Sequence, residues 1–227
     1  MRTWFRNRYL DVLGSIYIYN EHRGYTAIDD LLAAVQWRWP DNSELIDRIE
    51  KHRADERKHY LMFRRWFERR GMMPLAVDSA FGHIDRFVEI MFGKKIDDLD
   101  KREVVEDEDL FGRLCRVISL TEKRGYKQVE ILLRNSHVRS DRQLAKIFDI
   151  IEQDEPSHWQ PYDDWLAANG VRNAKWWERA VDSFIHSELL FLKLPFLFVH
   201  PRLKRSTRFA DQGEAVRRSS PITARAA

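Results

Sequence analysis

Two Glu-x-x-His pairs stand at matching places in the two halves of the chain. Glu56 precedes His59 by three residues, and Glu155 precedes His158 by three. On an α-helix this spacing puts both side chains on one face, one turn apart, so a carboxylate and an imidazole can reach the same ion. One such pair arises easily by chance, but these two share a context that chance does not readily repeat.

The shared context is a second motif upstream of each pair. Residues 21–25 read Glu-His-Arg-Gly-Tyr and residues 122–126 read Glu-Lys-Arg-Gly-Tyr, 35 and 33 residues before the Glu of each pair. If each motif and its pair lie on antiparallel helices, the two glutamates of a half meet at heights that differ by less than one turn, roughly 5 Å. The predicted ligands are Glu21, Glu56, His59, Glu122, Glu155 and His158.

Four carboxylates and two imidazoles suit a two-metal centre, since carboxylates can bridge ions about 3.5–4 Å apart. Oxygen ligands combined with imidazole favour iron, with manganese as the alternative. Glu152 lies one turn before Glu155 and is an alternative ligand. The single Cys115 excludes an internal disulfide and a cysteine-only zinc site.

With these motifs the sequence resembles the ferritin-like di-iron carboxylate superfamily over roughly residues 10–168. The resemblance implies that the six residues are metal ligands. It also implies a role for Asp55 and Asp154, which precede the two motif glutamates: in monooxygenases of this superfamily such an Asp orients a ligand His of the opposite motif. The alternative is that both are ordinary surface charges.

Gly24 and Gly125 follow the upstream glutamates by three residues and fall on the same helix face. Glycine inside a helix costs about 1 kcal/mol relative to alanine, so its repetition indicates either access for dioxygen and substrate or close helix packing. Tyr25 and Tyr126 follow by four residues and are the candidate catalytic residues, as hydrogen-bond donors to ligand carboxylates or electron carriers. Their alternative is burial as core aromatics.

The elements that must position these residues all read as helices. Apolar periodicity and stop signals predict helices over about 4–39, 41–70, 110–135, 140–169 and 173–193. Asp41 with Glu44 and Ser140 with Gln143 read as capping boxes, and Pro156 predicts a kink or π-bulge. The fold class is all-α: a ferritin-like four-helix bundle with a long crossover between the second and third helices and an additional C-terminal helix.

The predicted domains are a helical di-metal domain over 1–200 and a basic, disordered tail over 201–227. The net charge of +3 resides in this tail, which holds seven basic and two acidic residues after Pro201, so no specific nucleic-acid partner is expected. The N-terminus lacks the apolar run of a signal peptide, which predicts a cytoplasmic protein.

The segment 184–205 is rich in aromatic and aliphatic residues and ends in a basic cluster. Pro195 is expected to break its helix and leave Phe196, Leu197 and Phe198 in a loop. Such a segment indicates peripheral contact with an anionic membrane, here the inner membrane face, with burial against the bundle as the alternative.

The resemblance implies a di-iron oxidoreductase, a hydroxylase or monooxygenase that uses dioxygen, an external electron donor and an apolar small-molecule substrate. The first alternative is a ferroxidase or a peroxide-scavenging protein like ferritins and rubrerythrins, and the second is a non-catalytic helical binding protein. An apolar route to the metals would favour the oxygenase, whereas an acidic funnel would favour the ferroxidase.

Overall fold

The computed structural model describes residues 2–171, 174–200 and 203–213. Within these ranges the chain is helical, and β structure is limited to one isolated bridge between Leu75 and Arg205, so the predicted all-α class is confirmed. The helices are α1 (Arg2–Arg38), α2 (Ser43–Arg69), η1 (Ser79–Phe81), α3 (His83–Phe92), α4 (Lys101–Glu106), α5 (Glu108–Arg134), α6 (Ser136–Arg139), α7 (Arg142–Asp154), α8 (Pro156–Ala168), α9 (Trp176–Glu188), the π-helix η2 (Leu189–Lys193), α10 (Leu194–Val199) and η3 (Ala210–Gly213).

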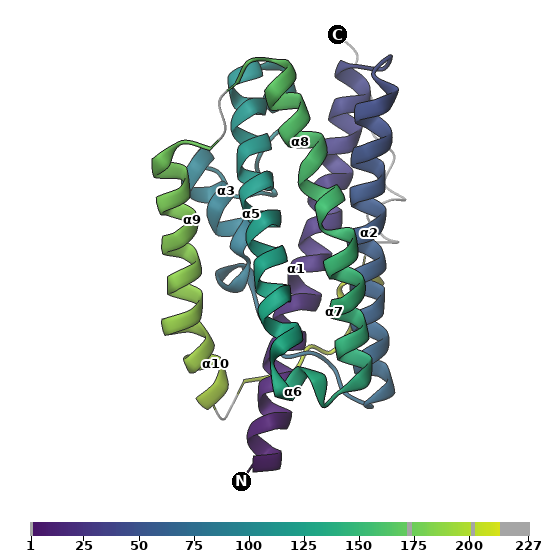
Figure 1. The fold of residues 1–227 in the computed structure, drawn as a ribbon, viewed down its shortest axis with the longest axis vertical. Helices are drawn as coiled ribbons and strands as arrows, with labels where there is room; N and C mark the ends of the chain where they lie inside the picture. Colours follow the sequence, from purple (N-terminus) through teal and green to yellow (C-terminus); the bar gives the residue numbers. More distant parts are fainter. Residues whose placement is uncertain (1, 172–173, 201–202, 214–227) are drawn as a thin grey trace.

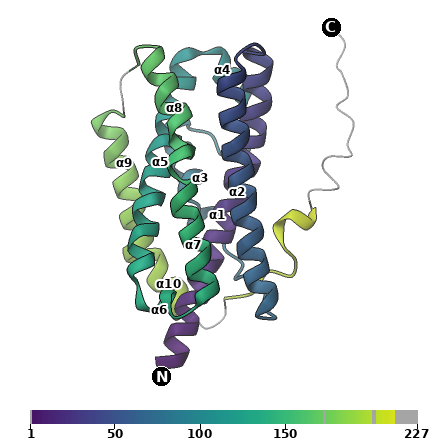
Figure 2. The ribbon, with the colours of Figure 1, turned by 45° about the vertical axis from the view of Figure 1, so that its right-hand side comes forward.

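The long helices lie side by side, as Figure 1 shows. A short turn joins α1 to the antiparallel α2, and α6 joins α5 to the antiparallel pair α7 and α8. The segment between α2 and α5 returns along the molecule to α4, which lies at the end where α1 meets α2 (Figure 2). Because of this return, α2 and α5 run in the same direction. The helix α9 lies against α3 and α5 at the outer edge.

The helix starts differ from the predicted capping boxes by one residue each. Asn42, rather than Asp41, caps α2, because its side chain accepts a hydrogen bond from the Leu45 amide. Asp141, rather than Ser140, caps α7 and accepts from the amides of residues 143 and 144. Asparagine and aspartate are as favourable as serine at a helix N-cap, so residue type alone does not decide which of two adjacent residues caps the helix. The local backbone geometry decides it.

Pro156 and Pro195, two prolines of the C-terminal helices, have visible consequences. At Pro156 the predicted kink appears as a break between α7 and α8. At Pro195 the helix was predicted to end, but it continues into α10, so residues 196–198 are helical. A π-turn precedes this proline, with the Leu194 amide bonded to the Leu189 carbonyl. Pro195 then falls in the first turn of α10, where a missing N–H costs little. The predicted start of this helix at residue 173 lies outside the described residues.

The apolar core forms two large clusters separated along the helix axes. One includes Leu31, Ile49 and Leu114, and the other includes Phe63 and Val129. Along α2, Ile49 and Phe63 bracket residues 52–59; along α5, Leu114 and Val129 bracket residue 122. The predicted metal ligands of α2 and α5 therefore lie between two apolar layers that exclude water.

Residues 203–213 pack against α1 and α2, although the sequence predicted a disordered tail from residue 201. The guanidinium of Arg205 forms two hydrogen bonds with the Asp11 carboxylate, at 2.9 and 2.6 Å. Phe209 is buried, and the Tyr60 hydroxyl donates to Asp211 at 2.7 Å. One buried aromatic ring and these charged bonds offset the entropy cost of ordering the segment. Residues 201–202 and 214–227 lie outside the described residues.

Candidate metal centre

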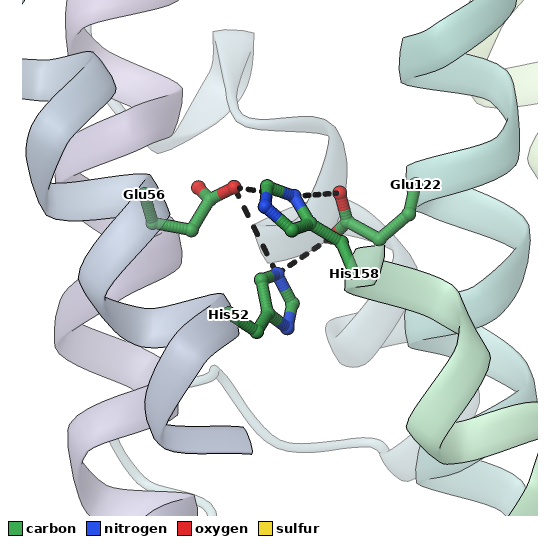
Figure 3. Close-up of side chains that lie close together, drawn as sticks. All are labelled: His52, Glu56, Glu122 and His158. Carbon is green, nitrogen blue, oxygen red and sulfur yellow. Dashed lines mark ion pairs between the residues drawn. The ribbon is translucent and has the colours of Figure 1, made fainter. Parts of the chain in front are cut away.

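Side chains from α1, α2, α5 and α8 converge midway along the helices in two overlapping groups. In the first, ligand-type atoms of His52, Glu56, Glu122 and His158 lie within 4.8 Å of one another; in the second, those of Glu21, Glu56 and His59 do. Figure 3 shows the first group, with the side chains of α2 facing those of α5 and α8. Glu56 belongs to both groups, so its carboxylate lies where it could bridge two ions.

Five of the six predicted ligands are in these groups, and the sixth, Glu155, adjoins them. Its Oε2 lies 3.7 Å from His158 Nδ1, which is itself 3.3 Å from Glu56 Oε1. On the other side, His59 Nδ1 lies 3.3 Å from Glu21 Oε2. The alternative ligand Glu152 belongs to neither group.

The break at Pro156 shapes the α8 side of this centre. Glu155 is the last residue to bond back into α7, through its amide to the Ile151 carbonyl. The His158 amide then donates to the Glu155 carbonyl, three residues earlier, which is the bond of a 3₁₀ turn. This tight turn keeps both side chains of the motif directed at the centre although the helix changes course.

His52 completes the first group, although the sequence motifs did not predict it. It is fully buried, and its Nε2 lies 3.8 Å from carboxylate oxygens of both Glu56 and Glu122. Its Nδ1 lies 3.1 Å from the Tyr162 hydroxyl, and its ring stacks on that of His158 at 4.3 Å. The available signal was its position four residues before Glu56, one turn back on the same face of α2.

Asp55 and Asp154 each lie behind an imidazole of the opposite half. His59 Nε2 is 2.9 Å from Asp154 Oδ2, a hydrogen bond, and His158 Nε2 is 3.6 Å from Asp55 Oδ2, a longer contact. Lys58 bonds to both carboxylates at 2.7 Å. Although burial opposes it, the contacts with His158, Lys51 and Lys58 hold the pKa of Asp55 below its usual range.

The buried environment disfavours the ionised form of three carboxylates of the centre. Burial, followed by the charge of Glu56, raises the pKa of Glu21 to about 7 and that of Glu122 to about 8. Burial and the charge of Glu122 raise the pKa of Glu155 well above its usual value. Four ionised carboxylates in one buried volume need compensating positive charge, and two divalent cations would supply it.

Unpartnered atoms provide an independent test of whether a metal fits. Among the described residues, the buried atoms without a hydrogen-bond partner include His52 Nε2, His59 Nδ1, Glu155 Oε2 and both ring nitrogens of His158. Such orphaned atoms are rare in proteins and require an explanation. All but His158 Nε2 face the centre, so the donor set of carboxylates and imidazoles fits a pair of iron or manganese ions.

A cavity of about 150 Å³ adjoins the carboxylates. Glu21, Glu56, Glu122 and Glu155 line it, and most of the remaining wall is aliphatic. The aliphatic residues come from α1, α3, α5, the crossover and η2: Ile16, Ala27, Ile28, Leu31, Ile84, Val88, Ile96, Leu99, Leu114, Ile118 and Leu189. Polar residues in the wall include Lys101 and Arg124. The centre is thus reached through a largely apolar space.

The two predicted access glycines behave differently. Both line the cavity, but a Cβ at Gly24 would collide with the Glu56 carboxylate, whereas one at Gly125 would lie 3.6 Å from Glu155, an ordinary contact. An alanine at position 24 would therefore displace the Glu56 carboxylate, which lies against this face of α1. At position 125 it only enlarges the cavity.

Neither predicted catalytic tyrosine lines the cavity. The ring of Tyr25 contacts those of His22 and Tyr60, and the ring of Tyr126 contacts Trp159 edge-on. The tyrosine in the cavity wall is Tyr17, one turn before Glu21. Its buried hydroxyl has no hydrogen-bond partner among the described residues, and burial, then the charges of Glu21 and Glu155, raise its pKa.

Comparison with protein-family models, curated proteins and solved structures finds no match to this chain.

Proposed function

We propose that this chain is a non-haem di-iron oxidoreductase: a ferritin-like four-helix bundle that binds two iron ions and uses dioxygen to hydroxylate or oxidise an apolar substrate. The connectivity supports the bundle assignment, because α2 and α5 are parallel and joined by a long crossover. The activity proposal depends on one observation above all. The four glutamates of the centre line a largely aliphatic cavity, and the buried imidazoles beside them have ring nitrogens without a hydrogen-bond partner.

In this proposal seven side chains hold the ions: Glu21, His52, Glu56, His59, Glu122, Glu155 and His158. The ions would supply the redox chemistry that activates dioxygen, which no side chain of the chain can supply alone. Asp154 fixes the ring orientation of His59 and holds its Nε2 proton away from the metal-facing Nδ1, and Tyr162 anchors His52.

The cavity wall would bind the apolar part of the substrate and exclude bulk water. Hydroxylation of a C–H bond consumes one dioxygen, two electrons and two protons; one oxygen atom enters the product and the other leaves as water. The chain needs an external electron donor for this balance, since its described residues hold one free thiol and no disulfide.

The lining of the cavity favours an oxygenase over a ferroxidase. A ferroxidase must admit hydrated iron repeatedly, which an acidic channel assists by attracting cations. Beyond the four ligand glutamates, the cavity wall has no other acidic side chain among the described residues and includes cationic Lys101 and Arg124. A non-catalytic bundle would gain nothing from four buried carboxylates, which disfavour the compact state without cations.

Metal analysis tests the first half of the proposal. After anaerobic addition of Fe(II) and removal of the excess, the protein should retain about two irons per chain. The double variant His59→Ala/His158→Ala should retain none, and His137→Ala is the control, since His137 packs against Tyr9 far from the centre. Unchanged iron content in the double variant would reject the ligand assignment.

Isotope labelling tests the second half. The iron-loaded protein, supplied with a chemical reductant and ¹⁸O₂, should insert one labelled oxygen into an apolar compound captured from a cell lipid extract. Iron oxidation with release of peroxide or water, and no labelled product, would favour the ferroxidase instead.

A further inference from the structure

The elements α9, η2 and α10 follow one another without a break and form one outer helix over residues 176–199. This helix presents an apolar face along its whole length. Its six most exposed large side chains, Trp176, Phe184, Phe191, Leu192, Phe196 and Val199, are between 56% and 81% exposed. Steps of seven or eight residues, two helical turns, separate Phe184 from Phe191 and Leu192, and Leu192 from Val199. The π-turn of η2 holds one residue more than an α-helical turn. This extra residue rotates α10 about the helix axis, so the exposed residues of α10 continue the same face as those of α9. We call these six residues the outer face.

The outer face is held outward by contacts on the opposite side of the same helix. Leu197 is fully buried against Val12 and Leu75, and the Arg8 guanidinium donates to the carbonyls of residues 197, 198 and 200. Near the other end, the Arg116 guanidinium bonds to the buried Glu178 carboxylate at 3.0 Å. The helix therefore cannot easily turn its apolar face inward.

The charges along this helix are arranged asymmetrically. Each of its acidic side chains has a basic partner: Glu178 pairs with Arg116, Asp182 with Arg124, and Glu188 with Lys193. The side chains of Lys175 and Arg179, by contrast, are exposed. The surface around the outer face thus offers apolar groups and exposed cations, with its acidic groups neutralised.

We infer that α9, η2 and α10 dock the protein on the surface of a bilayer containing anionic lipids, with the outer face inserted among the acyl chains. A helix that lies in the interface uses this combination of an apolar face and flanking cations. Among the described helices none has the length and hydropathy to cross a bilayer, so the contact we infer is peripheral.

The same helix also forms part of the cavity wall. Leu189 lines the cavity, while Leu190, Phe191 and Leu192 of the same π-turn are exposed. A π-turn is wider than an α-turn and often marks a functional position. Docking would bring this turn to the lipid phase, from which an apolar substrate could reach the centre. This delivery rests on the proposed function, whereas the docking does not.

A second copy of the chain fits the outer face less well. Two outer faces in contact would bring no unpaired acidic side chain to Lys175 or Arg179, whereas an anionic lipid surface neutralises both. The exposed cations Lys175 and Arg179 therefore favour an anionic bilayer over a second copy of the chain.

Sedimentation with vesicles tests the inference. The intact iron-loaded protein should bind vesicles of phosphatidylcholine with phosphatidylglycerol, and should bind less to phosphatidylcholine alone or at high salt. The variant Phe191→Ser/Phe196→Ser should partition at least about tenfold less, and Arg179→Glu about fivefold less. Iron content should stay unchanged in both, which separates loss of docking from loss of the metal centre.

Two matched controls should leave vesicle binding unchanged. Trp37→Ser removes an exposed aromatic ring from the far end of α1, about 43 Å along that helix from Arg8, which contacts α10. Arg142→Glu reverses an exposed cation on α7. The inference is overturned if the intact protein ignores anionic vesicles. It is also overturned if sedimentation equilibrium finds a dimer that Phe191→Ser/Phe196→Ser dissociates, because the outer face then binds a second copy.

Discussion

His59 Nε2 and Asp154 Oδ2 form a 2.9 Å hydrogen bond although they lie 95 residues apart in the sequence. The bond joins the imidazole of the first Glu-x-x-His motif to the carboxylate beside the second. Asp55 stands in the corresponding place behind His158, and Lys58 links the two aspartates. Each half of the centre therefore orients an imidazole of the other half.

The first prediction concerns this bond. Asp154→Asn should lower iron affinity by about 10- to 100-fold, because a neutral amide no longer fixes the tautomer or raises the basicity of His59. A chelator competition titration under anaerobic conditions measures the effect. Asp149→Asn, an exposed change on α7, is the control. Equal affinities for the two variants would show that Asp154 is only a surface charge.

The second prediction concerns His52. With His52 and His158 in one group and His59 in the other, the two irons should differ. The ⁵⁷Fe-loaded protein should give two Mössbauer doublets of equal area, and His52→Ala should retain about one iron per chain instead of two. The control is again His137→Ala. A single doublet, with full iron content in His52→Ala, would remove His52 from the ligand set.

The third prediction compares the two glycines. Gly24→Ala should displace the Glu56 carboxylate and reduce iron content, since the new Cβ would overlap it. Gly125→Ala should leave iron content unchanged and raise stability by roughly 0.5–1 kcal/mol, through the better helix propensity of alanine. Urea unfolding and metal analysis of the pair provide the measurements. Loss of iron in Gly125→Ala, but not in Gly24→Ala, would contradict the packing described here.

The fourth prediction concerns metal removal. In the proposed function iron binds only the folded chain, because unfolding disperses the centre, so free Fe(II) at 100 times the Kd should stabilise the fold by about 2.7 kcal/mol. For a chain of this size that corresponds to a rise in Tm of roughly 5–10 °C. Anaerobic thermal unfolding with and without Fe(II) measures it. The His59→Ala/His158→Ala variant should show no shift, and an equal shift in that variant would indicate binding elsewhere.

The sequence by itself determined the helical class and six of the residues that gather at the centre. Its doubled motifs predicted that Glu21, Glu56, His59, Glu122, Glu155 and His158 would converge, and the structure brings them together. This was possible because helical spacing is regular: residues three or four apart share a face, and helices of known length bring distant residues to the same height. The metal itself stays a prediction.

Only the tertiary structure decided the rest. His52 lacks a Glu-x-x-His frame, and its place in the centre depends on where Tyr162 of another helix directs its ring. Tyr17, rather than Tyr25, is the tyrosine of α1 that lines the cavity, because the rotation of α1 against α2 and α7 turns this side of the helix inward. Phe209 packs in one core cluster with Tyr60 and Phe63, and Leu197 of α10 packs in another with Val12 and Leu75. These partners lie far away in the sequence. Local spacing fixes which side chains share a helix face, but the free energy of packing between helices decides which face turns inward.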